Sequence, residues 1–107
     1  MQTALSVINA LGFTQFRPGE NDKDFSFSGP GVVVIACQDN SLPRSMVSFR
    51  LITALNADSD ALAVAKHSLS HGWECEGYLF ALLAAVPDRA ARLDAVATLD
   101  RMCSAGT

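Results

Sequence analysis

Residues 31–37 read Gly-Val-Val-Val-Ile-Ala-Cys, and this stretch is the strongest indication of the fold. Every side chain from Val32 to Cys37 is apolar, so neither face of a strand formed here can be left to solvent. We therefore expect this segment to be a central strand of a sheet that is covered on both sides. Cys37, at its end, is interpreted as a small buried hydrophobic residue.

Further strands are predicted on both sides of this segment. Residues 25–28 read Phe-Ser-Phe-Ser, the period-two pattern of a half-buried strand, and the Gly-Pro-Gly sequence at 29–31 would join it to the central strand as a hairpin. A short strand is predicted within 13–17. Residues 46–55 are rich in aliphatic and β-branched side chains and predict another strand. Its expected apolar face consists of Val47, Phe49, Leu51 and Thr53.

Three helices are indicated by their end signals. The first begins at a Thr3 cap and ends at Gly12, and the second runs from the cap-rich residues 56–60 to about His71, where Gly72 ends it. The last begins at Pro87. Its expected apolar face consists of Leu93, Val96, Ala97, Leu99 and Cys103.

The apolar run at 77–86 fits a buried helix or a buried strand. Its alanines and leucines favour a helix, whereas Tyr78 and Phe80 after Gly77 favour a strand. We expect a helix. The predicted fold is then α+β, with an N-terminal helix, an antiparallel sheet of three to four strands, and two to three C-terminal helices packed on one face.

The composition predicts one folded domain over 1–107, with 103–107 as a frayed tail. Half of the 107 residues are apolar and 18% are charged, which is too apolar for a disordered chain. The net charge is −3 and the eight basic residues are scattered, so neither a nucleic acid nor an anionic membrane is expected as partner.

The chain is expected to be cytoplasmic. Its N-terminus lacks the basic and apolar regions of a secretory signal, and its apolar runs fall short of the roughly 20 residues that a spanning helix needs. Cys37, Cys75 and Cys103 are odd in number and widely spaced. We interpret them as reduced thiols.

The chemistry is densest in residues 67–78, which hold both histidines, the single Trp and the single Tyr. His67 and His71 are four residues apart on a predicted helix, and Cys75 or Glu74 could complete a zinc site, but a second ligand motif is missing. A Cys75 nucleophile is disfavoured because the neighbouring carboxylates raise a thiol pKa. We therefore expect no catalytic residue, no metal and no bound cofactor.

The expected function is a non-enzymatic protein-binding module, namely an adaptor, chaperone, antiactivator or inhibitor that occludes or escorts a partner. Trp73, Tyr78, His71 and Arg44 are the predicted partner contacts, although Trp73 could instead close the core at a helix junction. The apolar content predicts a homodimer or a stable heterocomplex. Two alternatives stay open: a metal- or thiol-dependent enzyme or sensor using His67, His71 and Cys75, and a small-molecule-binding regulator.

Overall fold

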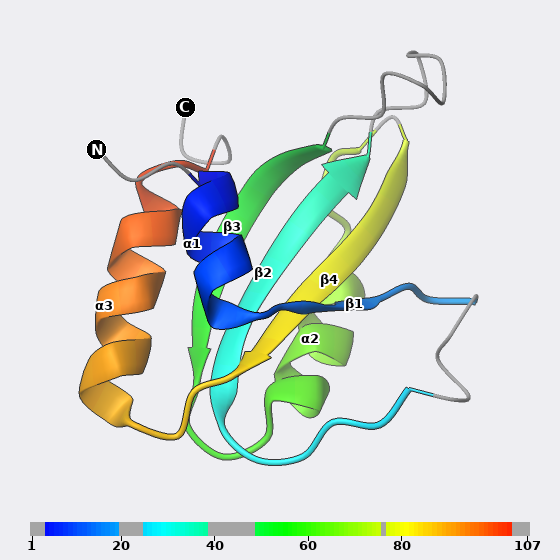
Figure 1. Ribbon diagram of the computed structural model, residues 1–107. Coiled ribbons are helices and arrows are strands. Elements are labelled where there is room, and N and C mark those ends of the chain that lie inside the picture. Colours follow the sequence, from blue (N-terminus) through cyan, green and yellow to red (C-terminus); the bar gives the residue numbers. More distant parts are fainter. Residues whose placement is uncertain (1–3, 20–24, 39–48, 76, 104–107) are drawn as a thin grey trace.

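The structure, a computed structural model, describes residues 4–19, 25–38, 49–75 and 77–103 (Figure 1). Predictions that concern Thr3, Arg44, Val47 and the tail at 104–107 lie outside these residues. Within them, no helix has the length and apolar character needed to cross a membrane. The elements in chain order are α1 (Ala4–Leu11), β1 (Thr14–Phe16), β2 (Gly31–Gln38), β3 (Phe49–Ala57), α2 (Ala61–Leu69), β4 (Tyr78–Ala85) and α3 (Arg89–Asp100).

The four strands form one sheet in the order β1-β4-β2-β3, and every neighbouring pair is antiparallel. The α+β class is therefore confirmed, as is the central place of β2. Val33, for example, lies opposite Leu55 of β3 and opposite Leu83 of β4. Both edges of β2 are thus occupied by other strands.

The alternating side chains of β2 form two separate hydrophobic clusters, one on each face of the sheet. The first cluster contains Val32 and Val34 of β2 with residues from α1 and α3, and the second contains Val33 and Ile35 with residues from α2. Figure 1 shows α1 and α3 together on one side of the sheet. The prediction that the later helices pack on one face is wrong, because β2 and β4 are apolar on both faces and each face needs a cover.

Residues 78–85 form strand β4, so the prediction of a helix over 77–86 is wrong. The side chains of β4 alternate between the clusters: Phe80 and Leu82 join the first, and Ala81 and Leu83 join the second. Pairing with β2 along the whole strand satisfies the backbone hydrogen bonds and buries both faces. This burial and hydrogen bonding outweigh the helix preference of Ala and Leu, which is worth less than about 1 kcal/mol per residue.

The predicted hairpin between 25–28 and the central strand is also wrong. Residues 25–28 are irregular, since β3 and β4 already occupy both edges of β2. Phe25 and Phe27 nevertheless pack half-buried against the second cluster, while Ser26 and Ser28 are exposed. The alternation therefore reflects alternate burial of an extended segment outside the sheet.

Strand β3 contains a β-bulge that divides its predicted single face. Ile35 lies opposite Thr53 and Ala36 lies opposite Leu51, so Ile52 is the extra residue. Leu51 consequently belongs to the first cluster and Ile52 to the second. Such an insertion shifts the inward and outward alternation of a strand.

The helix ends follow the predicted signals, with small differences. Gly12 has φ +70° and its N–H donates to Ile8 O at 3.1 Å, as expected of a helix C′ residue. Asp60 caps α2, but the helix ends at Leu69, before His71. Asp88 caps α3, so Pro87 precedes this helix rather than opening it.

A methyl group at Gly31 is expected to destabilise the fold, because β4 passes too close. A Cβ built there would overlap the backbone carbonyl oxygen of Ala84, and a backbone atom within a paired strand cannot move aside. We expect Gly31→Ala to lower the free energy of unfolding by about 1–3 kcal/mol, measured by urea denaturation. The exposed neighbour variant Ser28→Ala should change it by less than about 0.5 kcal/mol. Equal stabilities of the two variants would contradict the close approach.

Candidate functional site

Residues 67–78 form the junction between α2 and β4, and the structure divides their predicted contact residues between two faces of the sheet. His67 and His71 are exposed, and Trp73 and Tyr78 are half-buried. Trp73 packs against the second cluster, whereas Tyr78 packs against the first. Trp73 and Tyr78, two of the predicted partner contacts, therefore lie on opposite faces of the sheet.

Trp73 closes the carboxyl end of α2. Its indole N–H donates to the backbone oxygen of Ser68 at 2.8 Å, and its ring centroid lies 5.8 Å from that of His71. Gly72, with φ +82°, reverses the chain so that the ring can return to the helix end. This is the arrangement expected of a Trp that covers the core at a helix junction.

Cys37 and Cys75 form a disulfide, so the interpretation of these cysteines as reduced thiols is wrong. Their Cα atoms are 5.8 Å apart and their sequence separation is 38 residues. Cys37 ends the buried part of β2 on the face that carries α2, and the segment after α2 brings Cys75 onto it. The sequence spacing shows nothing of this pairing, and Cys103 is the remaining free cysteine.

The disulfide bears directly on the hypothesis of a metal or thiol site. In the oxidised form the sulfur of Cys75 is neither a thiolate ligand nor a nucleophile. The ring centroids of His67 and His71 are 6.0 Å apart. In the part of the chain that the structure describes, no three His, Cys, Asp or Glu side chains gather closely enough to hold a metal ion.

A groove of about 490 Å³ lies between the end of β1 and the carboxyl half of α2. Its wall is mainly apolar, and the ammonium nitrogen of Lys66 lies 6.0 Å from the ring centroid of Phe16. The residues that line it are Phe16, Pro18, Lys66, Leu69 and Ser70. Sequence reasoning missed this groove, because its two walls are about fifty positions apart and neither carries a motif.

Polar and cation–π contacts hold in place Pro18, which lines the groove, and its neighbour Arg17. The Tyr78 hydroxyl donates to the backbone oxygen of Pro18. The Arg17 guanidinium lies 5.6 Å from the centroid of the Tyr78 ring and 5.1 Å from that of Phe80, and it donates to Gln38 Oε1 at 3.3 Å. Tyr78 thus holds Pro18, which lines the groove, although the Tyr78 ring packs on the opposite face of the sheet.

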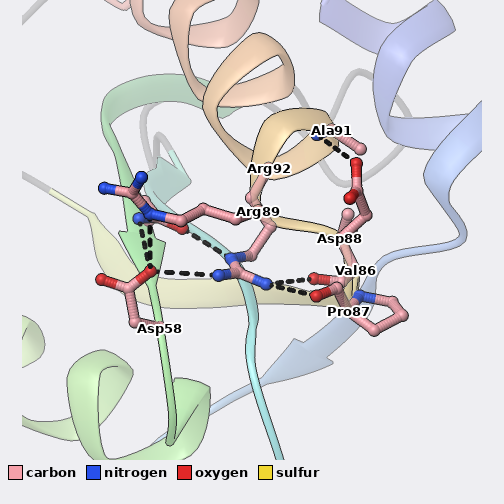
Figure 2. Close-up of polar contacts among 8 residues, drawn as sticks. Asp58, Val86, Pro87, Asp88, Arg89, Ala91 and Arg92 are labelled. Atoms are coloured by element: carbon pink, nitrogen blue, oxygen red, sulfur yellow. Dashed lines mark hydrogen bonds and ion pairs between the residues drawn. The ribbon is translucent and has the colours of Figure 1, made fainter.

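Arg92 is a buried charged residue of α3, only 4% exposed, and Figure 2 shows its guanidinium at the centre of a polar cluster. It donates to Asn56 Oδ1 at 2.7 Å and to Asp58 Oδ1 at 3.0 Å. It also donates to the backbone oxygens of Val86 at 3.0 Å and Pro87 at 2.8 Å. These bonds tie the start of α3 to the end of β3 and to the chain leaving β4, which is a structural role.

The buried side of α3 differs from the predicted apolar face because it includes the charged residue Arg92. Arg92, Ala95 and Leu99 are buried, whereas Leu93 is 44% exposed. An arginine was not expected on the inner side. It lies there because carbonyl and carboxylate oxygens accept its N–H groups, and the side-chain acceptors Asn56 and Asp58 come from a distant part of the chain.

Asp58 is expected to make the free energy of unfolding of the protein depend on pH. The hydrogen bond from Arg92, and then that from Asn56, lower the pKa of the Asp58 carboxyl below its ordinary 3.8. Because the folded pKa is below the unfolded one, the contribution of Asp58 is fully present above the ordinary value and is lost as the pH falls through the folded pKa. Urea denaturation between about pH 5 and pH 2 should show this loss, and Asp58→Asn should remove part of the slope. An unchanged slope in the variant would contradict the assignment.

Cys103 is a free thiol on a different part of the molecule. It follows α3 and donates to the Leu99 backbone oxygen at 3.3 Å. Burial, and secondarily the charge of Asp100, raises the pKa of Cys103 to about 11. The thiol is therefore protonated near neutral pH and weakly nucleophilic.

In comparisons with known proteins, no protein-family model, no curated protein and no solved structure matched this chain.

Proposed function

We propose that the protein is a small non-enzymatic protein-binding module, an adaptor, chaperone, antiactivator or inhibitor, that works by occluding or escorting a protein partner. The observation that carries the proposal is the groove between β1 and α2. It combines an apolar wall with one ammonium group, and its wall is fixed by Tyr78 and Arg17. A preformed apolar concavity with a few polar groups is typical of a binding site.

The partner that fits this groove is a peptide segment with a bulky apolar side chain next to a carboxylate. Phe16, Pro18 and Leu69 provide the contact for the apolar side chain. Lys66 provides the charge complement, because its ammonium lies over Phe16 on the same groove. The volume of about 490 Å³ admits a short segment rather than a whole domain.

An array of short synthetic peptides tests this proposal. The folded full chain should bind peptides in which Leu or Phe lies beside Asp or Glu, and Lys66→Glu should abolish that binding. Arg101→Glu is the matched control, since Arg101 is exposed at the end of α3, away from the groove. Binding that Lys66→Glu leaves unchanged, or no binding to such peptides, would contradict the proposal.

We also propose that the chain forms either a homodimer or a stable heterocomplex. β3 is an edge strand of the sheet, nine residues long, and Arg50 is its one charged residue. Long edge strands with few charges and no proline can pair with a strand of another chain. Light scattering across a dilution series should give twice the 11.4 kDa chain mass. A monomer at every concentration would exclude the homodimer.

A small-molecule-binding regulator is a second candidate, favoured by the size of the groove. Sites for small ligands span about 300–1,000 Å³, and the groove falls in that range. Lys66 would then select an anionic amphiphile. A thermal-shift screen of fatty acids and aromatic carboxylates tests it, with Lys66→Glu as the variant and Arg101→Glu as the control.

The proposed location is cytoplasmic, and neither nucleic acid nor an anionic membrane is proposed as a partner, given the net charge of −3. The disulfide is the observation that weighs against the cytosol, where such bonds are rare and are usually transient or redox-sensing. Trapping free thiols by rapid alkylation in intact cells would show which redox form the protein has there. The enzyme or sensor alternative with His67, His71 and Cys75 requires the reduced form.

A further inference from the structure

We propose that the Cys37–Cys75 disulfide is a redox-reversible cross-link that holds residues 70–75, including Trp73, against the sheet while the rest of the fold stays intact. The geometry that carries this proposal is the unequal setting of the two half-cystines. Cys37 is 4% exposed within the paired strand β2, whereas Cys75 is half-buried in an irregular segment. One end of the cross-link is rigid and the other lies on a short connection.

The 70–75 segment is irregular and lacks the strand pairing of the sheet, and Trp73 packs only half-buried against the second cluster. Trp73 donates its indole N–H to Ser68, and the backbone oxygen of Glu74 accepts a hydrogen bond of 2.8 Å from Arg50 Nη2. β2 and β4, in contrast, are paired along eight residues and bury both faces. Segments with few buried contacts open at a lower free energy than the core strands. Loss of the disulfide should therefore release the segment before the sheet.

The chemistry is thiol–disulfide exchange with a dithiol reductant. A thiolate of the reductant attacks the Cys75 sulfur, which is the more accessible one, and the Cys37 sulfur leaves and takes up a proton. The second thiol of the reductant then closes its own disulfide and releases Cys75 as a thiol. Two electrons and two protons pass to the protein, and a disulfide oxidant reverses the step. The freed Cys37 thiol remains in the second cluster as a small apolar residue.

The cross-link belongs to this chain alone, so its reversibility does not depend on whether the groove binds a partner. It would also give the groove a means of control. Leu69 and Ser70 line the groove and lead directly into the 70–75 segment, so movement of that segment alters one end of the wall.

Trp73 is the single Trp of the chain, so its fluorescence reports on the segment. The full-length protein is titrated with dithiothreitol, and emission, acrylamide quenching and far-ultraviolet circular dichroism are recorded. We expect a red shift and stronger quenching with the circular dichroism retained, and return of both fluorescence signals on reoxidation. Cys75→Ser should show the reduced signal without reductant. Cys103→Ser, the matched control, should behave as the wild type.

Hydrogen exchange on the reduced wild-type protein keeps the test valid if Cys75→Ser fails to fold. Protection should be lost in residues 70–75 while β2 and β4 remain protected. The proposal is overturned if Trp73 emission does not change on reduction, or if the segment and the strands lose protection together. Limited alkylation provides a further check, since Cys75 should be modified before Cys37.

Discussion

Replacing Arg92 with methionine is expected to lower the free energy of unfolding by about 2–4 kcal/mol, because a buried acceptor loses its donor and further partly buried hydrogen bonds are lost. Methionine fills a similar length but donates no hydrogen bond. The backbone oxygens of Val86 and Pro87 and the side-chain oxygen of Asn56 would lose their donor. The buried Val86 oxygen left unsatisfied costs about 1–3 kcal/mol, and the partly buried Pro87 and Asn56 oxygens cost less because water can reach them. Urea denaturation at neutral pH measures the loss.

Arg89→Met is the matched control for this prediction. Arg89 lies one turn earlier on α3, its side chain is 72% exposed, and its Nε is 3.7 Å from the Asp58 carboxylate. Exposed ion pairs of this kind contribute about 0–1 kcal/mol. Similar losses in the two variants would show that Arg92 does not organise the cluster. Arg92→Lys should recover little of the loss, because an ammonium cannot reproduce the fork of a guanidinium.

Reduction of the Cys37–Cys75 disulfide is expected to lower the free energy of unfolding by about 4 kcal/mol. The cross-link closes a loop with a sequence separation of 38 residues. Closing a loop of that length removes chain entropy from the unfolded state, which corresponds to about 4 kcal/mol near 25 °C. The measurement compares urea denaturation of wild-type protein with and without dithiothreitol.

Cys103→Ser separates this effect from any other thiol chemistry. The variant keeps the disulfide, so it should show the same loss on reduction as the wild type. A denaturation midpoint that reductant does not change would contradict the prediction. This global effect is distinct from the local release of residues 70–75, which concerns the folded protein.

Several elements could be predicted because local residues specify them. The apolar residues of β2 indicate a strand covered on both faces, and Gly12 and Asp60 mark the ends of α1 and α2. Helix caps and glycines with a positive φ interact with residues within one turn of the chain, so they can be recognised from the local sequence.

The incorrect predictions concern segments whose local pattern is compatible with two different tertiary structures. The run at 78–85 is apolar enough for a buried helix or a buried strand, and pairing with β2 decides in favour of the strand. Residues 25–28 alternate as a strand does, but both edges of β2 are occupied. Leu93 is apolar yet exposed, whereas the charged Arg92 lies on the inner side of α3.

The candidate site likewise combines features that local residues specify with features that only tertiary contacts decide. The stretch at 67–78 is rich in chemical groups, but the sheet separates Trp73 from Tyr78, and Cys75 pairs with Cys37. The groove joins Phe16 to Lys66 across about fifty positions, which no spacing rule connects.

By itself, the sequence determined the α+β class, the central strand, the end of α1 at Gly12 and the start of α2 at Asp60, since apolar periodicity and capping depend on near neighbours. Only the tertiary structure decided that residues 78–85 form strand β4, that Cys37 pairs with Cys75, and where the Arg92 cluster and the groove lie. Each of these depends on which distant segments share a face of the sheet, and strand order settles that through backbone pairing and burial on both faces of β2.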